Sequence, residues 1–244
     1  MPRPAFYALR RGGWRDLVTI LHPPYTLWHL SYVALGAAAA PHPHGDRVLA
    51  ALAAFFLAVG VSAHALDELQ GRPLNTALSD RTLVGLAALG LVAALAIGVA
   101  GCIVVSATLV PFVLAGVFLV LAYNLELFDG RFHTDLWFAV AWGAFPALTA
   151  WWSNALAVHG LGDLLALAGT TLGCFWITTV QRRLSTPVRE LRRRTASVEG
   201  SQRLVDGTAR ELSVASLAAP LDGALRALSV GLPLLAAGLL AVRL

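Results

Sequence analysis

Residues 62–74 read Ser-Ala-His-Ala-Leu-Asp-Glu-Leu-Gln-Gly-Arg-Pro-Leu, and they close an apolar run long enough to cross a membrane. On a helix, His64 meets Asp67 at i+3 and Glu68 at i+4, so three ligand-type side chains lie together at one end of an apolar helix. Ionisable groups at membrane depth are energetically costly and mark functional sites by default. The stretch therefore predicts a membrane-spanning helix and a functional site at its end.

The composition indicates a membrane protein. Hydrophobic residues make up 57% of the 244 residues and charged residues 13%, against about 25% charged in soluble domains. Seven apolar segments each approach the roughly 17–25 residues of a membrane helix. They are Tyr25–Ala40, Val48–Leu66, Leu83–Ala100, Ile103–Ala122, Leu136–Trp152, Leu164–Val180 and Gly223–Val242. We therefore expect an all-α fold, a polytopic transmembrane helical bundle of about seven spans, forming a single integral-membrane domain over residues 1–244.

The arginines predict the orientation of this bundle. The chain has no lysine, and all of its 18 arginines except Arg47 and Arg243 fall on one side of the predicted spans. That side includes the basic N-terminus, residues 1–21, and an arginine-rich loop, residues 182–211. The positive-inside rule places this side, with the polar site, in the cytoplasm of a multi-pass cell-membrane protein. The first span is expected to be uncleaved, and the formal charge of +4 requires no nucleic-acid partner.

Two local patterns predict where helices end near the C-terminus. Thr186 and Pro187 are typical of an N-cap and a first-turn proline, which predicts a short surface helix stopped by Gly200. Pro220 and Asp222 interrupt the last apolar region, which is too short for two spans. We therefore expect the sixth span to end near Val180, a separate short helix to begin at Thr186 and Pro187, and the last span to begin at Gly223.

Four segments between residues 22 and 150 follow one another as the motifs of a known enzyme family do. They are His22-Pro-Pro-Tyr-Thr-Leu-Trp28, Ala63-His-Ala-Leu-Asp67, Arg72-Pro-Leu-Asn-Thr-Ala-Leu-Ser-Asp-Arg81, and Tyr123 with Trp142-Gly-Ala-Phe-Pro146. The first three resemble the Arg-Pro-x-Thr-Leu, Asn-Asp-x-x-Asp and Arg-Pro-Leu-x-x-Gly-x-(Ile/Leu)-Ser motifs of the intramembrane aromatic prenyltransferase superfamily, the UbiA-type enzymes. The last resembles the ends of that family's fourth and fifth helices. The chain is thus similar to a divergent member of this superfamily.

The resemblance implies a reaction and a set of site residues. Similar enzymes hold an isoprenoid diphosphate through Mg²⁺ bridged by two carboxylate clusters, and they transfer the prenyl group to a lipophilic acceptor. The implied partners are an isoprenoid or other lipid substrate and the surrounding membrane lipids. The expected catalytic residues are Asp67, Glu68 and His64; the expected substrate-binding residues are Arg72, Tyr123, Arg182 and Arg183; the expected metal ligands are His64, Asp67, Glu68 and Glu126.

The chain departs from the family pattern at both carboxylate clusters. Ala63 and His64 replace Asn and Asp in the first motif, Gly71 stands where a third carboxylate is usual, and residues 178–190 lack the second aspartate-rich motif. The family also usually has nine spans. Magnesium prefers oxygen ligands, and a cluster containing a histidine suits a transition metal better. Arginines such as Arg182, Arg183 and Arg189 provide another way to hold phosphate.

These departures leave two alternatives beside the prenyltransferase hypothesis. One is a different metalloenzyme on the same scaffold, with iron or zinc held by His64, Glu68 and Glu126, joined by His133 or His29. The other is a non-catalytic module that binds a lipid or a quinone.

Each candidate residue also has a structural explanation. His64, Asp67 and Glu68 could simply pair with Arg72 at a helix end, and the arginines of residues 189–194 could serve topology and anionic-lipid contact. On either enzyme hypothesis, His64, Asp67, Arg72, Glu126 and Arg182 are expected to line one apolar-walled pocket.

Overall fold

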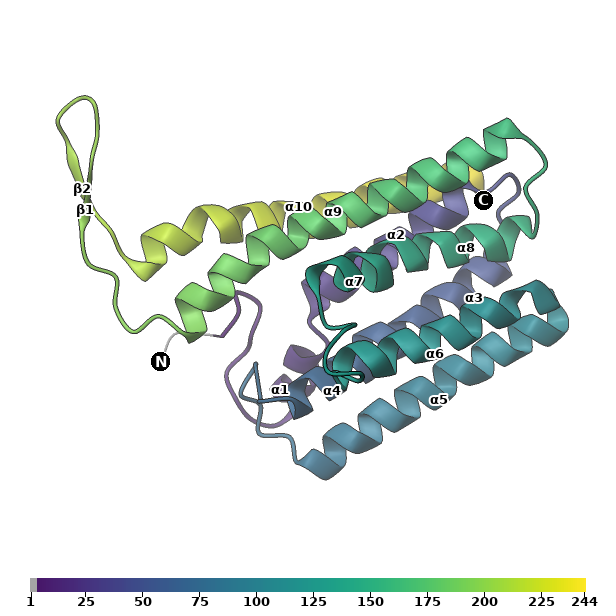
Figure 1. Cartoon of the computed structure of the whole chain (residues 1–244), viewed down its shortest axis with the longest axis horizontal. Helices are drawn as coiled ribbons and strands as arrows, with labels where there is room; N and C mark the ends of the chain where they lie inside the picture. The colour runs from purple at the N-terminus through teal and green to yellow at the C-terminus, as the bar shows by residue number, and fades with distance from the viewer. Residues whose placement is uncertain (1–3) are drawn as a thin grey trace.

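Long helices run back and forth along the molecule in a computed structural model that describes residues 4–244. The chain is 73% helical and has almost no sheet. The described N-terminal residues and the C-terminus lie at opposite ends of the bundle (Figure 1). Arg3, counted above among the arginines of the predicted inner side, lies outside the described residues. The helices are α1 (Trp14–Ile20), α2 (Pro23–Ala39), α3 (Gly45–Phe55), η1 (Phe56–Ala63), α4 (His64–Leu69), α5 (Asp80–Val104), η2 (Ala107–Leu109), α6 (Val110–Asn124), α7 (Asp135–Ala139), η3 (Val140–Ala144), α8 (Phe145–Ala155), α9 (Leu161–Arg193) and α10 (Val214–Arg243).

Five helical stretches within residues 4–244 are long and apolar enough to cross a membrane, which confirms an all-α membrane bundle. They are Gly45–Leu69, Asp80–Val104, Ala107–Asn124, Leu161–Arg193 and Val214–Arg243. The other two predicted spans lie on α2, which has 17 residues, and on the continuous stretch of α7, η3 and α8. A count of seven spans stays a prediction. On α5, Leu89 and Val92 are 72% and 63% exposed, as side chains that face lipid are.

The sequence-based expectation of two helix breaks near the C-terminus is wrong. α9 continues through Pro187 to Arg193, and α10 runs unbroken through Pro220 and Pro233. Residues 182–193, predicted as part of a loop, therefore belong to α9. A proline inside a helix costs about 3 kcal/mol, but Val188 of α9 packs with Leu225 of α10 in one buried cluster. Packing between the two helices offsets the cost of the prolines.

Asp222 stabilises this helix pair instead of ending α10. Its side chain is buried and forms an ion pair with Arg192 of α9. Between the two helices, the short antiparallel strands β1 (Ser201–Arg203) and β2 (Ala209–Glu211) form an exposed hairpin. Only the segment from residue 194 to residue 213 therefore projects as a polar connection.

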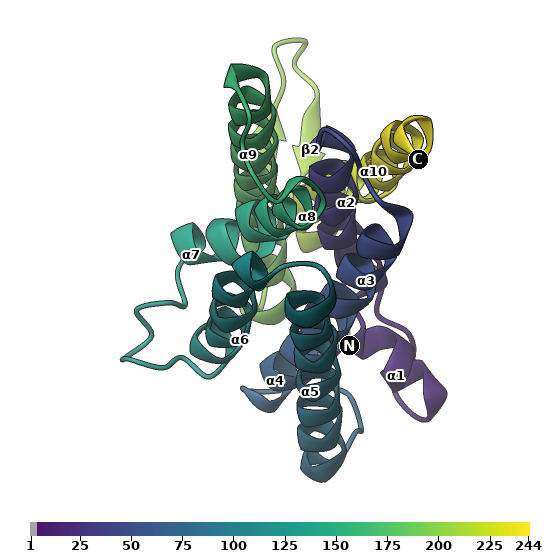
Figure 2. The ribbon, with the colours of Figure 1, turned by 90° about the vertical axis from the view of Figure 1, so that its right-hand side faces the viewer.

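α2 occupies the centre of one half of the bundle, packed between α8 and α10 (Figure 2). Its Trp28 and Tyr32 side chains are fully buried, and Trp28 Nε1 donates a hydrogen bond to Tyr32 Oη at 2.5 Å. Gly36 permits a close approach to α8, because a Cβ at this position would lie 2.1 Å from the carbonyl oxygen of Ala147. Because glycine has no side chain, the backbones of α2 and α8 come into direct contact at this position, as is common in membrane bundles.

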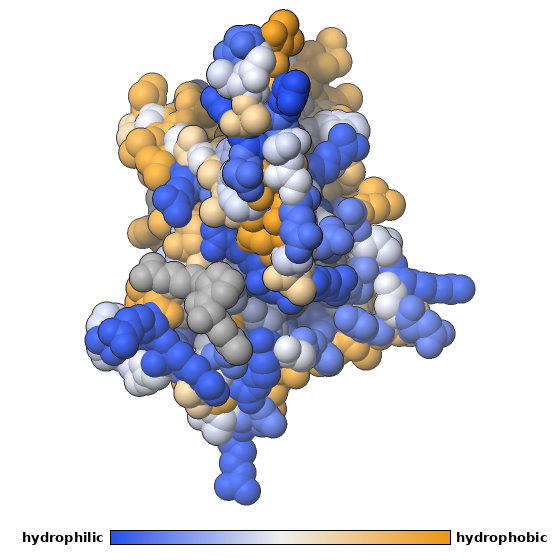
Figure 3. Space-filling model, turned by 90° about the vertical axis from the view of Figure 1, so that its left-hand side faces the viewer, coloured by the Kyte–Doolittle hydropathy of each residue, from blue (hydrophilic) through white to orange (hydrophobic). Residues whose placement is uncertain are grey.

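The two ends of the bundle differ in polarity. Figure 3 looks onto the end that carries α1 and the β-hairpin, where hydrophilic side chains cover much of the surface and hydrophobic side chains lie toward the flanks. The N-terminal segment, the loop after α4 and the ends of α6 and α9 also lie at this end (Figure 1). We call it the polar end.

We expect Gly36→Ala to destabilise the fold by about 3 kcal/mol, because the added methyl group overlaps a backbone oxygen that cannot rotate away. Gly173→Ala on α9 is the matched control, since its added Cβ meets no atom within 4 Å. Thermal unfolding midpoints of both variants in detergent provide the measurement. A Gly36→Ala midpoint equal to that of the unmodified protein contradicts the close packing of α2 on α8.

Candidate functional site

A cavity of about 490 Å³ lies at the polar end, between the N-terminal segment and the ends of several helices. Its lining combines charged, aromatic and histidine side chains. The polar and aromatic residues used below are Tyr7, His22, Tyr25, His29, His64, Asp67, Tyr123, His133, Phe138, Trp142, Gln181, Arg182, Arg189 and Arg193. Cavities of this size that are part apolar and carry a few converging polar groups are the usual form of a ligand site.

One wall consists of His64 and Asp67, in the first turn of α4. The preceding η1 is a π-helix, in which each turn contains more residues than an α-helical turn, and such segments occur often at functional sites. His64 Nδ1 lies 3.2 Å from the carbonyl oxygen of Gly60. This contact fixes the imidazole against η1, so the transition from η1 to α4 sets the direction in which both side chains point.

His22 and Tyr7 extend this wall. The His22 ring stacks on the His64 ring with centroids 4.0 Å apart, and the Tyr7 hydroxyl lies 3.0 Å from His22 Nδ1. His22 adopts a left-handed backbone conformation with φ 45°, just before Pro23 at the start of α2. Burial, and then the neighbouring His64, hold the pKa of His22 well below its usual value, and burial raises the pKa of Tyr7. Both groups are therefore uncharged near neutral pH.

The opposite wall is a row of polar side chains on α9. Residues 182, 189 and 193 are seven and eleven positions apart, which places them on one face of a helix. Arg182 Nε donates to Asp135 Oδ1 at 2.6 Å, and its guanidinium lies 5.2 Å from the centre of the Phe138 ring. Arg189 donates to Thr186 Oγ1 at 3.4 Å, and Arg193 donates to the Pro4 carbonyl oxygen at 3.4 Å. Among the described residues, no carboxylate forms an ion pair with Arg189 or Arg193.

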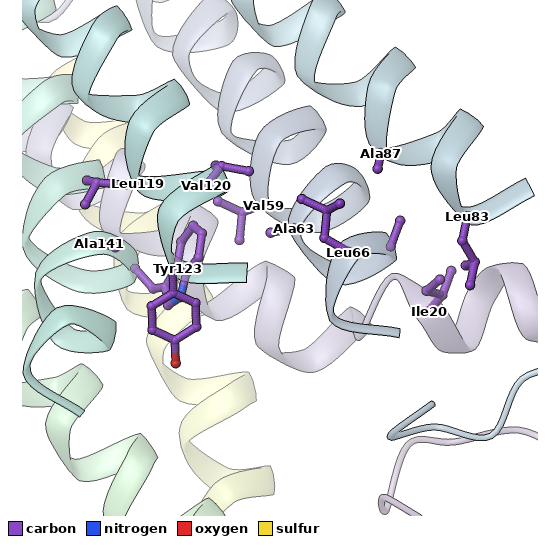
Figure 4. Close-up of a cluster of buried hydrophobic side chains, with 12 residues drawn as sticks. Ile20, Val59, Ala63, Leu66, Leu83, Ala87, Leu119, Val120, Tyr123 and Ala141 are labelled. Carbon is purple, nitrogen blue, oxygen red and sulfur yellow. The ribbon is translucent and has the colours of Figure 1, made fainter. Parts of the chain in front are cut away.

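Aromatic rings connect the cavity with the apolar core. Tyr123 and Trp142 line the cavity and also belong to the buried cluster drawn in Figure 4, with ring centroids 5.6 Å apart. The rings of His133 and Tyr123 stack with centroids 4.5 Å apart, and His133 Nδ1 lies 2.9 Å from the Tyr123 carbonyl oxygen. His29 Nδ1 lies 2.8 Å from the Trp142 carbonyl oxygen. The cavity is therefore polar at two walls and aromatic where it meets the core.

Four of the predicted site residues come together in this cavity: His64, Asp67, Tyr123 and Arg182. They derive from three parts of the chain: α4, α6 and α9. The ends of α4 and α9 thus face one cavity, as expected from the sequence. His29 and His133, named as further metal ligands under the iron or zinc alternative, also line it.

Glu68, Arg72, Glu126 and Arg183 do not line the cavity, so the expectation that Arg72 and Glu126 share it is wrong. Both carboxylate oxygens of Glu68 accept hydrogen bonds from the following loop. Arg72 forms an ion pair with Asp80 and donates to the Leu78 carbonyl oxygen at 2.5 Å. Glu126 is more than half exposed, 3.9 Å from His133 Nδ1, and Arg183 is exposed outside the cavity lining.

Glu68 holds the loop after α4 in place. Its Oε2 accepts from the Leu74 amide at 2.9 Å, and its Oε1 accepts from the Thr76 amide at 2.8 Å and the Thr76 hydroxyl at 2.9 Å. The side chain is buried, with 1% exposure for the residue. Asp16 of α1 holds the same loop through the Ala77 amide at 2.8 Å. The motif residues of the Arg-Pro-Leu loop are therefore part of a hydrogen-bonded support beside the cavity.

Several lining residues were not singled out from the sequence as site residues. They are Tyr7, His22, Tyr25, Gln181 and Arg193. The seven- and eleven-residue spacing of Arg182, Arg189 and Arg193 was a usable signal, but the expected helix break at Pro187 hid it. Tyr7 gave no signal, and His22 stood only at the start of the segment that resembles Arg-Pro-x-Thr-Leu, because their positions in the site depend on how the N-terminal segment folds back over the bundle.

The residues present do not fit the metal sites that the sequence suggested. Within residues 4–244, no three His, Cys, Asp or Glu side chains are grouped so that they could hold a metal ion. Glu68 is committed to the loop, and Glu126 lies outside the cavity. The parallel rings of His22 and His64 direct their in-plane lone pairs side by side, so these do not converge on one ion. The two carboxylates of the first motif, Asp67 and Glu68, therefore do not both face the cavity.

Comparison of the chain with protein-family models, with curated proteins and with solved structures finds no match in any of the three.

We expect Glu68→Gln to lower the free energy of unfolding by about 1–3 kcal/mol, because its amide NH₂ group would face a backbone N–H or hydroxyl donor from which a Glu68 oxygen now accepts a hydrogen bond. Glu126→Gln is the matched control at an exposed carboxylate and is expected to change stability little. Denaturation in detergent measures both. A stable Glu68→Gln variant that has lost activity would assign Glu68 to the chemistry instead.

Proposed function

We propose that this protein is a membrane-embedded transferase of the prenyltransferase type, which moves a polyprenyl group from its diphosphate to a lipophilic acceptor. The single observation that carries the proposal is the cavity in which His64 and Asp67 of α4 face the arginines of α9. An anionic head group fits the arginine wall, and the aromatic rings beside the core suit an apolar chain. An amphiphilic, phosphate-bearing lipid combines both properties.

The chemistry can be written with the side chains of the cavity. The bond between the allylic carbon and the diphosphate oxygen breaks, the diphosphate leaves with the bonding electrons, and a nucleophilic atom of the acceptor bonds to the carbon. The acceptor loses one proton, and Asp67, which lines the cavity together with the arginines of α9, receives it. Tyr123 and Trp142 offer ring faces that stabilise the positive charge developing on the allylic group. No step in this scheme passes through a metal ion.

The non-catalytic alternative, a module that binds a lipid or quinone, shares the same cavity and differs only in turnover. The iron or zinc alternative has less support, because Glu68 and Glu126 lie outside the cavity lining. His29, His64 and His133 line the cavity, but each Nδ1 already contacts a carbonyl oxygen.

We further propose that the polar end faces the cytoplasm of a cell membrane. The N-terminal segment, the loop after α4 and the end of α9, which carry arginines, lie at this end (Figure 1), whereas Arg47 donates to the carbonyl oxygen of Ser153, in the last turn of α8, and Arg243 donates to that of Ala40, just after α2. The positive-inside rule relates such asymmetry to orientation.

The transferase proposal predicts that Asp67→Asn lowers the rate of prenyl transfer by about 100-fold, the scale of a lost general base, without weakening ligand binding. The assay uses the purified protein in detergent with farnesyl diphosphate and phenolic or quinol acceptors, and it quantifies the prenylated product by mass spectrometry. Asp46→Asn, at an exposed position near the opposite end, is the control.

Binding of farnesyl diphosphate without product would favour the non-catalytic alternative. Neither binding nor product would contradict both proposals for the cavity.

The orientation predicts that a reporter fused after Leu244 is active only outside the cytoplasm, whereas a reporter at the N-terminus is active inside. Paired fusions to a phosphatase and to a fluorescent protein make this measurement. A cytoplasmic C-terminal reporter would contradict the proposed orientation and leave the cavity unaffected.

A further inference from the structure

α9 carries a cationic stripe, made of Arg182, Arg189 and Arg193, that faces the cavity. Along the axis of an α-helix, Arg189 and Arg193 are about one turn, or about 6 Å, apart. Arg182 lies about 10 Å further from the C-terminal end of α9 than Arg189 does. Arg182 and Arg189 are half-buried, and Arg193 is exposed at the mouth. The stripe therefore runs from the cavity mouth toward its aromatic side.

Ordinary helix-end effects explain only part of this stripe. Cations in the last turn of a helix are favoured by the helix dipole, which accounts for Arg193. The dipole does not account for Arg182, which lies eleven residues before the end of α9. Membrane topology needs arginines at this end but not on one face, and the exposed Arg183 serves topology equally well. The shared orientation toward the cavity remains to be explained.

A second, independent observation points to a ligand. Gln181 is 3% exposed and lines the same cavity, and its Oε1 has no hydrogen-bond partner among the described residues. Buried polar atoms normally have a hydrogen-bond partner, because an unpaired one loses its hydration without compensation. The amide can present either its oxygen or, after rotation, its NH₂ group. A ligand with polar oxygens at this depth would satisfy it.

The charges around the cavity also favour an anion. Asp67 is close enough to Arg189 and Arg193 for their charges to interact, but it forms an ion pair with neither. Asp222 is paired with Arg192. Arg182 contacts Asp135, whose side chain is 73% exposed, so that pair is screened by solvent. Two to three guanidinium groups thus remain available to bidentate phosphate contacts.

We propose that the cationic stripe binds the diphosphate group of an isoprenoid diphosphate directly, with Gln181 completing the site and without a bridging divalent cation. The inference rests on the proposed function and specifies how its substrate is held. The arginines take the place of the two carboxylate clusters and their bridging metal in similar enzymes. The direct site explains why only one carboxylate of the first cluster lines the cavity and why α9 carries arginines where a second cluster is expected.

The test measures equilibrium binding to the full-length protein in detergent, with farnesyl diphosphate, farnesol and inorganic pyrophosphate as probes, each with EDTA or with MgCl₂. We expect farnesyl diphosphate to bind in EDTA within about threefold of its affinity in magnesium, and farnesol to bind far more weakly. Arg189→Gln is expected to weaken farnesyl diphosphate binding by about tenfold or more, the scale of a lost charged hydrogen bond. Arg183→Gln, on the same helix but outside the cavity lining, is the matched control.

Two further variants keep the test independent of folding. Arg189→Lys retains the charge without the planar fork and is expected to restore part of the affinity. His64→Asp adds the carboxylate found in similar enzymes. A direct arginine site loses affinity from this added negative charge with or without magnesium, whereas a magnesium clamp gains affinity when magnesium is present.

The outcomes separate the inference from the proposed function. Binding that requires magnesium, or that improves in His64→Asp with magnesium, overturns the direct site and leaves prenyl transfer possible. Pyrophosphate that binds as tightly as farnesyl diphosphate overturns the assignment to an isoprenoid substrate. Absence of farnesyl diphosphate binding in every condition, together with absence of product, overturns the proposed function as well.

Discussion

Inside a bilayer every backbone N–H and C=O must find its hydrogen-bond partner within the protein, and the arrangement of this chain follows from that constraint. Helices meet it internally, so the spans can be apolar around their whole circumference. Even the prolines of α9 and α10 remain inside helices, because the packing of Val188 against Leu225 and the Arg192–Asp222 ion pair hold the two helices together. Polar side chains are then left to gather at the polar end, and the cavity forms among them.

Adjacent residues on α4 illustrate how the polar end divides its tasks. Asp67 points into the cavity, whereas Glu68, about 100° further around the helix, accepts three hydrogen bonds from Leu74 and Thr76. The carboxylate of Asp67 is thus open to a ligand, whereas that of Glu68 is fully used in hydrogen bonds that hold the loop. The same division separates Arg182, which faces the cavity, from its neighbour Arg183, which faces outward.

The parts of the structure that depend on local composition could be predicted from the sequence. The apolar runs of the sequence predicted the membrane helices. The polar residues at the ends of two of these runs predicted His64, Asp67 and Arg182 as site residues. The parts that depend on tertiary contacts could not. Pro187 is a helix breaker in isolation and is overridden only by packing against α10. The loop after α4 draws Glu68 and Arg72 away from the cavity, and the N-terminal segment brings in Tyr7 and His22.

The π-helix η1 has a consequence for how such a site can change over evolutionary time. Adding or removing one residue there alters the length of the helix by only about 1.5 Å but rotates everything that follows by about 100°. Ser62 is the only polar side chain of η1, and it is buried. A single-codon insertion or deletion in η1 would therefore change which side chain of α4 faces the cavity, for instance Glu68 in place of Asp67. The length of η1 thus decides which side chains of α4 face the cavity.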